Sequence, residues 1–210
     1  MSVPPPTVPP PTVPPPIIPP PTVPGRFALH PHPATPVSAA WSVGVATRWS
    51  PLGLVIEYSI LVPAGRIVLP PRSRSPAARD FLWKRTCGEL FVGVRGEPSY
   101  IEFNLSPSGD WASYAFDGYR ENSRPRPWQG PSPEVRVLQG EGATRLMATV
   151  PHAAFHVLRR ADPAATLQAG FTLVLETTPG DLSFWALAHP RAQPEFHDRD
   201  GFIADFTVSE

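Results

Sequence analysis

The chain has 210 residues, a formal net charge of zero and 32 prolines. This length suffices for one sizeable domain with or without a tail, and the balanced charge argues against nucleic acid or an anionic membrane as the main partner. The single cysteine, Cys87, excludes an intrachain disulfide, and no apolar run approaches the roughly 20 residues that span a bilayer. Because no basic and then apolar leader opens the sequence, we expect a cytoplasmic protein.

The first segment is a proline repeat. Residues 3–24 read VPPPTVPPPTVPPPIIPPPTVP. Proline fixes φ near −65° and has no backbone donor, so the repeat predicts an extended polyproline II arm. The arm is interpreted as a solvated spacer, and the alternative is a ligand for an aromatic groove of the SH3 or WW kind. We therefore expect a disordered arm over residues 1–26 and one domain over residues 27–210.

From Phe27 onward, short apolar or alternating runs lie between prolines and glycines. These runs predict strands at Ser42–Trp49, Leu54–Val62, Ile67–Leu69, Glu89–Val94, Tyr100–Leu105, Ala112–Phe116, Val135–Leu138, Arg145–Val150, Leu167–Thr177, Leu182–Ala188 and Phe202–Val208. Only His152–Arg160 is typical of a helix, of a turn or two. About ten strands without alternating helices predict an all-β, antiparallel sandwich.

Turn residues indicate which strands pair. The sequence Thr178-Pro179-Gly180-Asp181 between Leu167–Thr177 and Leu182–Ala188 is a hairpin signal. Gly140 and Gly142 likewise predict a hairpin between Val135–Leu138 and Arg145–Val150.

Motifs for catalysis are not found in the sequence. It has no phosphate-cradling glycine loop, no nucleophile elbow and no helical zinc motif, and we expect no enzyme. Cys87 begins an apolar run and is expected to be a buried thiol, with a nucleophile as the alternative. The loop HPRAQPEFHDRD holds His189, Glu195, His197 and Asp198, which could converge on a metal, although such residues in a loop more often are solvated or cap turns.

Six tryptophans are many for this length. Core packing is the ordinary role of Trp41, Trp49 and Trp111. Trp83 and Trp185 differ, because each lies beside polar residues. A flat aromatic face next to a carboxylate suits a pyranose ring, and Trp83 with Glu89, six residues on, could supply both groups; core packing remains the alternative.

Three blocks carry a family resemblance: LWKRTCGELFV, YIEFNLSPSGDWASYAFDGYR, and LSFWALAHP followed by PEFHDRDGF. In this order they resemble the bacterial DOMON-like proteins, relatives of family 9 carbohydrate-binding modules and of haem-binding DOMON domains. The resemblance covers most of residues 41–208. It implies an immunoglobulin-like β-sandwich with a ligand pocket on one face.

The resemblance also implies residue roles. In family 9 modules, a tryptophan six residues before a glutamate stacks on a terminal sugar, and this pattern falls on Trp83 and Glu89. A second tryptophan closes the pocket near the C-terminal strands, where Trp185 is the best positional match. Haem DOMONs use a methionine and a histidine as axial ligands. The candidates here are Met147 with one of His152, His156, His189 and His197.

We therefore expect a non-enzymatic domain that binds a small molecule of the carbohydrate kind. The candidate ligand-binding residues are Trp83, Glu89, Trp185, Asn104, Trp111, Tyr119 and His189. Trp83 and Trp185 should flank one pocket with Glu89 at its floor or rim. A strand holds residues six apart at roughly 20 Å, so the chain between Trp83 and Glu89 must bend or begin as a loop. The alternatives are a haem-binding electron-transfer module and a protein-interaction module.

Overall fold

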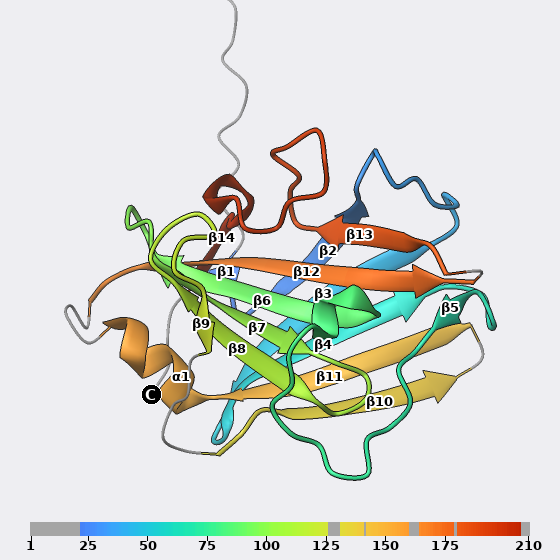
Figure 1. The fold of residues 1–210 in the computed structure, drawn as a ribbon, viewed down its shortest axis with the longest axis horizontal. Helices are drawn as coiled ribbons and strands as arrows, with labels where there is room; N and C mark the ends of the chain where they lie inside the picture. The colour runs from blue at the N-terminus through green and yellow to red at the C-terminus, as the bar shows by residue number, and fades with distance from the viewer. Residues whose placement is uncertain (1–21, 126–130, 141, 160–163, 179, 207–210) are drawn as a thin grey trace, which may run out of the picture.

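A computed structural model describes residues 22–125, 131–140, 142–159, 164–178 and 180–206. The described chain is all-β, mostly antiparallel, with few helical turns (Figure 1). Its strands are β1 (Thr22–Val23), β2 (Arg26–Pro31), β3 (Ser42–Ser50), β4 (Gly53–Leu61), β5 (Ile67–Val68), β6 (Cys87–Val94), β7 (Tyr100–Leu105), β8 (Trp111–Phe116), β9 (Arg124–Pro125), β10 (Glu134–Gly140), β11 (Ala143–Pro151), β12 (Leu167–Thr177), β13 (Leu182–Ala186) and β14 (Ala204–Phe206). The helical turns are η1 (Leu82–Lys84), α1 (His152–His156), η2 (Val157–Arg159) and η3 (Arg199–Gly201).

The strands follow the order β10-β11-β4-β3-β2-β13-β12-β6-β7-β8-β9. Strand β2 joins two halves of this sheet, because it pairs with β3 on one edge and with β13 on the other. The halves cross over one another, with β6, β7, β8 and β12 in front of β3, β4 and β11 in Figure 1. They are in contact, since the Tyr58 hydroxyl of β4 donates to the Glu89 carbonyl oxygen of β6 over 2.6 Å.

The main core lies between the two halves. Leu90 of β6 and Phe103 of β7 face Ile56 and Tyr58 of β4 and are fully buried, as is Leu146 of β11. These residues follow the two-residue period of a strand, which predicts one apolar face for each half.

The opposite face of β6, β7 and β8 is buried too. Every residue of Tyr100–Leu105 is buried, so strand β7 is covered on both sides. Tyr100 and Phe91 belong to a second aromatic cluster with Phe116 and Phe202. The covering chain is the segment after β13, because Phe196 and His197 contact Phe91. This outer face holds the site described below.

The two predicted hairpins are confirmed. Leu175 of β12 pairs with Ser183 of β13, and Arg136 of β10 pairs with Met147 of β11. The predicted helix is confirmed as the single turn α1 followed by η2. The sequence did not predict strand β2, because Pro24 precedes it and Pro31 is its last residue, and prolines argue against a strand.

The structure corrects the boundary expected at residue 26. Thr22–Val23 forms β1 and pairs in parallel with β14, and Val23 is 1% exposed within the core. The Gly25 N–H also donates to the Thr47 hydroxyl over 2.9 Å. The last residues of the proline repeat are therefore part of the folded domain. The arm over residues 1–21 lies outside the described residues.

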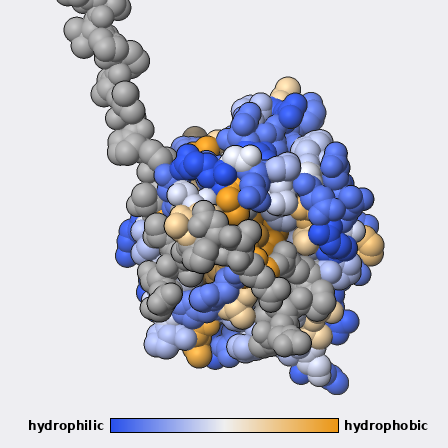
Figure 2. All heavy atoms as spheres, turned by 90° about the vertical axis from the view of Figure 1, so that its left-hand side faces the viewer, coloured by the Kyte–Doolittle hydropathy of each residue, from blue (hydrophilic) through white to orange (hydrophobic). Residues whose placement is uncertain are grey.

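The surface seen in Figure 2 is mostly hydrophilic outside the grey atoms, with hydrophobic side chains in small separate patches. In the described part of the chain, no helix has the length and apolar character needed to cross a membrane.

Candidate functional site

A pocket of about 540 Å³ opens on the outer face of β6, β7, β8, β12 and β13. Its apolar and aromatic lining consists of Phe81, Trp83, Phe91, Tyr114, Phe116, Pro125, Val174, Phe184, Pro194 and Phe196. Its polar lining consists of Asp80, Glu89, Glu102, Arg120, Ser123 and His197. The volume lies within the range of small-molecule sites, roughly 300–1,000 Å³.

Glu89 forms part of the pocket's floor. It is the third residue of β6 and is 2% exposed, and its Oε2 accepts a hydrogen bond from the Thr172 hydroxyl of β12 over 2.9 Å. Burial, followed by repulsion from Glu102, raises the pKa of this carboxyl well above its ordinary value, although the Thr172 hydrogen bond opposes the shift. Glu89 is therefore an acidic group that holds its proton more tightly than an exposed glutamate does.

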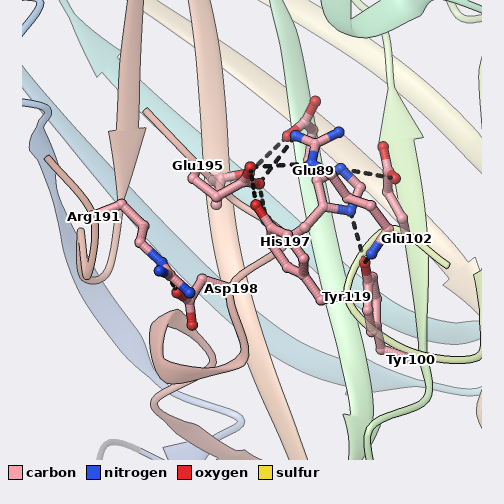
Figure 3. Close-up of polar contacts among 10 residues, drawn as sticks. Glu89, Tyr100, Glu102, Tyr119, Arg191, Glu195, His197 and Asp198 are labelled. Carbon is pink, nitrogen blue, oxygen red and sulfur yellow. Dashed lines mark hydrogen bonds and ion pairs between the residues drawn. The ribbon is translucent and has the colours of Figure 1, made fainter. Parts of the chain in front are cut away.

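Glu102 is the second acidic group of the floor. It lies on the neighbouring strand β7 and is 4% exposed, and its Oε1 accepts from the Asn104 amide over 2.5 Å. Burial raises the pKa of Glu102 to about 7, against the opposing effects of Asn104 and Arg120. Its other oxygen lies 3.8 Å from Nε2 of His197. Figure 3 shows Glu89, Glu102 and His197 close together.

A polar network holds the segment that covers the floor. Arg120 donates from Nε and Nη2 to the two oxygens of Glu195, each over 3.0 Å, and Tyr119 donates to Glu195 over 2.9 Å (Figure 3). Burial alone would raise the pKa of Glu195, but these bonds and the His197 N–H lower it. Arg120 also donates its backbone N–H to the Tyr100 hydroxyl over 3.2 Å, so the network ties the turn after β8 to the segment after β13.

His197 is neutral at physiological pH. Its Nδ1 lies 2.8 Å from the Tyr100 hydroxyl oxygen. That oxygen accepts a hydrogen bond from the Arg120 backbone N–H, so the hydroxyl proton is donated to Nδ1 of His197. Burial, and then the positive charge of Arg120, lower the pKa of His197 to about 4. The imidazole thus adds no positive charge to the pocket.

Aromatic rings form the rim. Phe81 and Trp83 are 61% and 44% exposed, and their rings meet edge to face at 6.3 Å. Lys84 places its ammonium nitrogen 4.5 Å from the Phe81 ring centre and 5.6 Å from that of Trp83. Phe81 has a φ of 63°, which is uncommon for a bulky residue and costs conformational energy. The strained turn holds two large rings in the solvent beside the pocket.

The structure brings Trp83 and Glu89 to one pocket. The chain between them is the turn η1 followed by the start of β6 at Cys87, so the predicted loop is confirmed. Asn104 is fully buried and holds Glu102 rather than lining the pocket. Tyr119 is 51% exposed and is not part of the lining, and its hydroxyl donates to Glu195, which also lies outside the lining.

The structure corrects the expectation that Trp185 forms the second wall. Trp185 is 1% exposed in the main core and donates to the Ser183 hydroxyl over 3.1 Å. Its neighbour Phe184, opposite Val174 on β12, lines the pocket instead. The reason is the two-residue period of β13, which turns adjacent side chains to opposite faces.

Two further candidates also lie away from the pocket lining. Trp111 begins β8 and pairs with Leu105. Nε2 of His189 lies 2.8 Å from the His30 carbonyl oxygen, and burial lowers the pKa of this histidine. Since that oxygen can only accept, Nε2 of His189 is the donor.

Sequence reasoning missed Glu102, Arg120 and much of the aromatic lining. A signal for Glu102 was present, because Tyr100, Glu102 and Asn104 alternate with the apolar Ile101, Phe103 and Leu105. Polar residues at every second position of such a strand indicate a polar site on its second face. No comparable local signal marks Arg120, which enters the pocket from a turn.

The metal ligands suggested by the sequence do not converge, and Met147 is separated from His197. Among the described residues, no group of three or more His, Cys, Asp and Glu side chains could hold a metal ion. Glu195 is bound to Arg120, and Asp198 to Arg191. Met147 lies on β11 between two core residues and so faces away from the core, on the other half of the sheet from His197.

Comparisons with known proteins support the fold. The chain is similar in structure to a candidate carbohydrate-binding protein from Bacteroides uniformis, with a TM-score of 0.61, 17% identity, and coverage of 87% of this chain and 86% of that one. Weaker similarities link it to a family 9 carbohydrate-binding module from Caldicellulosiruptor kristjanssonii. In complex with cellotriose, the TM-score is 0.46 at 9% identity, with 85% and 80% covered. In complex with glucose, the TM-score is 0.44 at 9% identity, with 86% and 84% covered.

No family model matches the sequence, and no curated protein matches it. The comparisons therefore show that the fold resembles that of a candidate carbohydrate-binding protein.

Proposed function

We propose that this protein is a non-enzymatic domain that binds a small sugar in the pocket on the outer face of β6, β7 and β8. The observation that carries the proposal is the combination of an exposed tryptophan at the rim with buried carboxyl groups at the floor. The Trp83 ring offers a flat apolar surface for the C–H face of a pyranose. Glu89 and Glu102 offer hydrogen-bonding oxygens for its hydroxyls.

The dimensions and the fold support the proposal. A pocket of about 540 Å³ accommodates one or two sugar rings. The similar structure from Bacteroides uniformis is that of a candidate carbohydrate-binding protein. The proposal includes the finer expectations from the sequence, namely an immunoglobulin-like sandwich of the DOMON-like kind and a cytoplasmic location.

Calorimetric titration with a panel of mono- and disaccharides tests the proposal. We expect at least one sugar to bind the wild type and Trp83→Ala to weaken that binding by about 1–3 kcal/mol, as for other stacked aromatic anchors. Leu138→Ala is the matched control, because Leu138 is 58% exposed on β10 and is not part of the pocket lining. Equal losses in both variants, or no binding by the wild type across the panel, would contradict the proposal.

A further inference from the structure

The floor of the pocket has an excess of acidic groups. The lining contains Asp80, Glu89 and Glu102 but only one arginine or lysine, Arg120. That guanidinium already donates from Nε and Nη2 to the two oxygens of Glu195. Within the described residues, neither Glu89 nor Glu102 forms an ion pair with an arginine or lysine.

The two floor carboxyls are close neighbours on one face. Glu89 pairs with Asn104, and Glu102 pairs with Phe91, so the two glutamates are diagonal partners on adjacent strands. Diagonal neighbours lie at about 7–8 Å between their backbones, and long side chains reach across that distance. One ligand group can therefore contact both carboxyls.

One oxygen of Glu89 is open to a ligand. Its Oε2 accepts from Thr172, whereas Oε1 has no hydrogen-bond partner in the part of the chain that the structure describes. The residue is only 2% exposed and lines the pocket. Oε1 is not among the buried polar atoms that lack a partner, so it is accessible from the pocket, where a donor on a ligand can bond to it.

The rim already holds an ammonium group. Lys84 Nζ lies over the Phe81 ring at 4.5 Å and near the Trp83 ring at 5.6 Å, and Lys84 itself is not part of the pocket lining. Electron-rich ring faces attract cations, more strongly where water is excluded. The pocket thus offers rings and acceptor oxygens, which is the chemistry that recognises an ammonium ion.

We infer that the pocket prefers a sugar that carries a protonated amine over the corresponding neutral sugar, with the amine bound between Glu89 and Glu102. This inference rests on the proposed function for the sugar ring, and on the charge imbalance of the floor for the amine. Arg120 compensates the two carboxyls only in part, and the ammonium adds a further positive charge and donates to the open oxygen of Glu89.

Proton release follows from this arrangement. Burial raises the pKa of Glu102 to about 7 and that of Glu89 well above its ordinary value, and a bound ammonium opposes both shifts, so its binding near neutral pH should release protons from the floor. Affinity for an amino sugar should therefore rise as pH increases through about 7.

The other groups around the floor whose pKa values are shifted do not titrate in this range. Cys87, Tyr58, Tyr100 and Tyr114 have raised pKa values and stay neutral. His197 is neutral because its pKa is lowered to about 4. Arg120 and Glu195 stay ionised as a pair, the pKa of the first being raised and that of the second lowered.

Calorimetric titration with glucosamine and 6-amino-6-deoxyglucose, each compared with glucose and N-acetylglucosamine, tests the inference. The amine on a methylene carbon stays protonated through the neutral range, as a lysine amine does. We expect about a tenfold tighter binding of 6-amino-6-deoxyglucose than of glucose above neutral pH, which is the usual strength of a charge-assisted hydrogen bond. Titrations in buffers of different ionisation enthalpy should show protons released by amino sugars and none by neutral sugars.

Glu102→Gln should abolish the preference and the proton release, so that the variant binds amino sugars and glucose with similar affinity. Glu134→Gln is the matched control, because Glu134 is an exposed glutamate of β10 outside the pocket. Glu89→Gln gives a second reading if the first variant does not fold, since the amide oxygen that this substitution introduces can still accept from the Thr172 hydroxyl.

The outcomes separate the two proposals. Glucose binding as tight as that of the amino sugars, with no proton release, would overturn this inference and leave the proposed function standing. Binding of cyclohexylamine with proton release, without binding of any sugar, would overturn the proposed function and support the cationic site. If neither class binds, both are overturned.

Discussion

At the scale of single residues, adjacent side chains on a strand have opposite roles. Trp185 belongs to the core, and Phe184 beside it lines the pocket. The same alternation on β6 sends Leu90 to the core and Glu89 to the floor. A residue's register, more than its chemical type, therefore decides whether its loss affects binding or stability.

The two candidate tryptophans should differ in their effect on stability. Trp83→Ala should lower the free energy of unfolding by less than about 1 kcal/mol, because the ring is 44% exposed. Trp185→Ala should lower it by about 3–5 kcal/mol, since it removes a fully buried ring and leaves a cavity. Chemical denaturation of both variants measures the difference, and comparable losses would place Trp83 in the core as well.

The pH dependence of stability should reveal Glu102. A raised native-state pKa means that the native state binds the proton more tightly than the unfolded chain does. Its contribution to stability is thus present below the ordinary glutamate pKa and is lost as pH rises through about 7. We expect Glu102→Gln to raise the melting temperature relative to wild type above neutral pH, and much less near pH ~5.

His197 acts with the opposite sign, since its lowered pKa means that stability is lost as pH falls toward about 4. It is present in both proteins, so its effect largely cancels in the comparison between wild type and Glu102→Gln. A constant difference in melting temperature at all pH values would contradict a buried, titrating Glu102.

At the scale of elements, the site depends on how closely β6 approaches β4. A Cβ atom at Gly88 would lie 2.8 Å from a ring carbon of Tyr58 and 3.0 Å from a methyl carbon of Leu146. Tyr58 in turn donates to the Glu89 carbonyl oxygen. The core contact and the pocket floor are thus joined through two consecutive residues of β6.

Gly88→Ala should therefore destabilise the domain by about 1–3 kcal/mol, as overpacking of a core does. Gly140→Ala is the control, because the nearest atom to its added Cβ lies 3.9 Å away, an ordinary contact. Equilibrium unfolding in urea measures both. If Gly88→Ala proves as stable as Gly140→Ala, the two halves of the sheet are less tightly packed at this point than described.

At the scale of the whole molecule, the start of the folded domain lies within the proline repeat. Val23 is buried, and its strand pairs with β14 near the other end of the described chain. Strand β14 also pairs with β12, so β1 is connected to β12 through β14.

Two truncations should bracket this boundary. Deletion of residues 1–20 should leave the melting temperature within about a degree or two, since a proline repeat has few donors and buries little apolar area. Deletion of residues 1–25 should lower it by about 5 °C, because it removes buried Val23 and the Gly25–Thr47 hydrogen bond. Calorimetric melting distinguishes them, and equal melting temperatures would show that β1 adds nothing to stability.

The sequence by itself determined most of the strands, both hairpins and the loop between Trp83 and Glu89, because these depend on two-residue periodicity and on turn residues close in the chain. Only the tertiary structure decided that Phe184 replaces Trp185 in the pocket, that Arg120 binds Glu195 about 75 residues away, and that Glu102 joins Glu89. Strand register and the packing of distant segments set these contacts, and neither is encoded in a local pattern. The sequence thus predicted that Trp83 and Glu89 lie near each other, and the fold determined which other residues line the pocket.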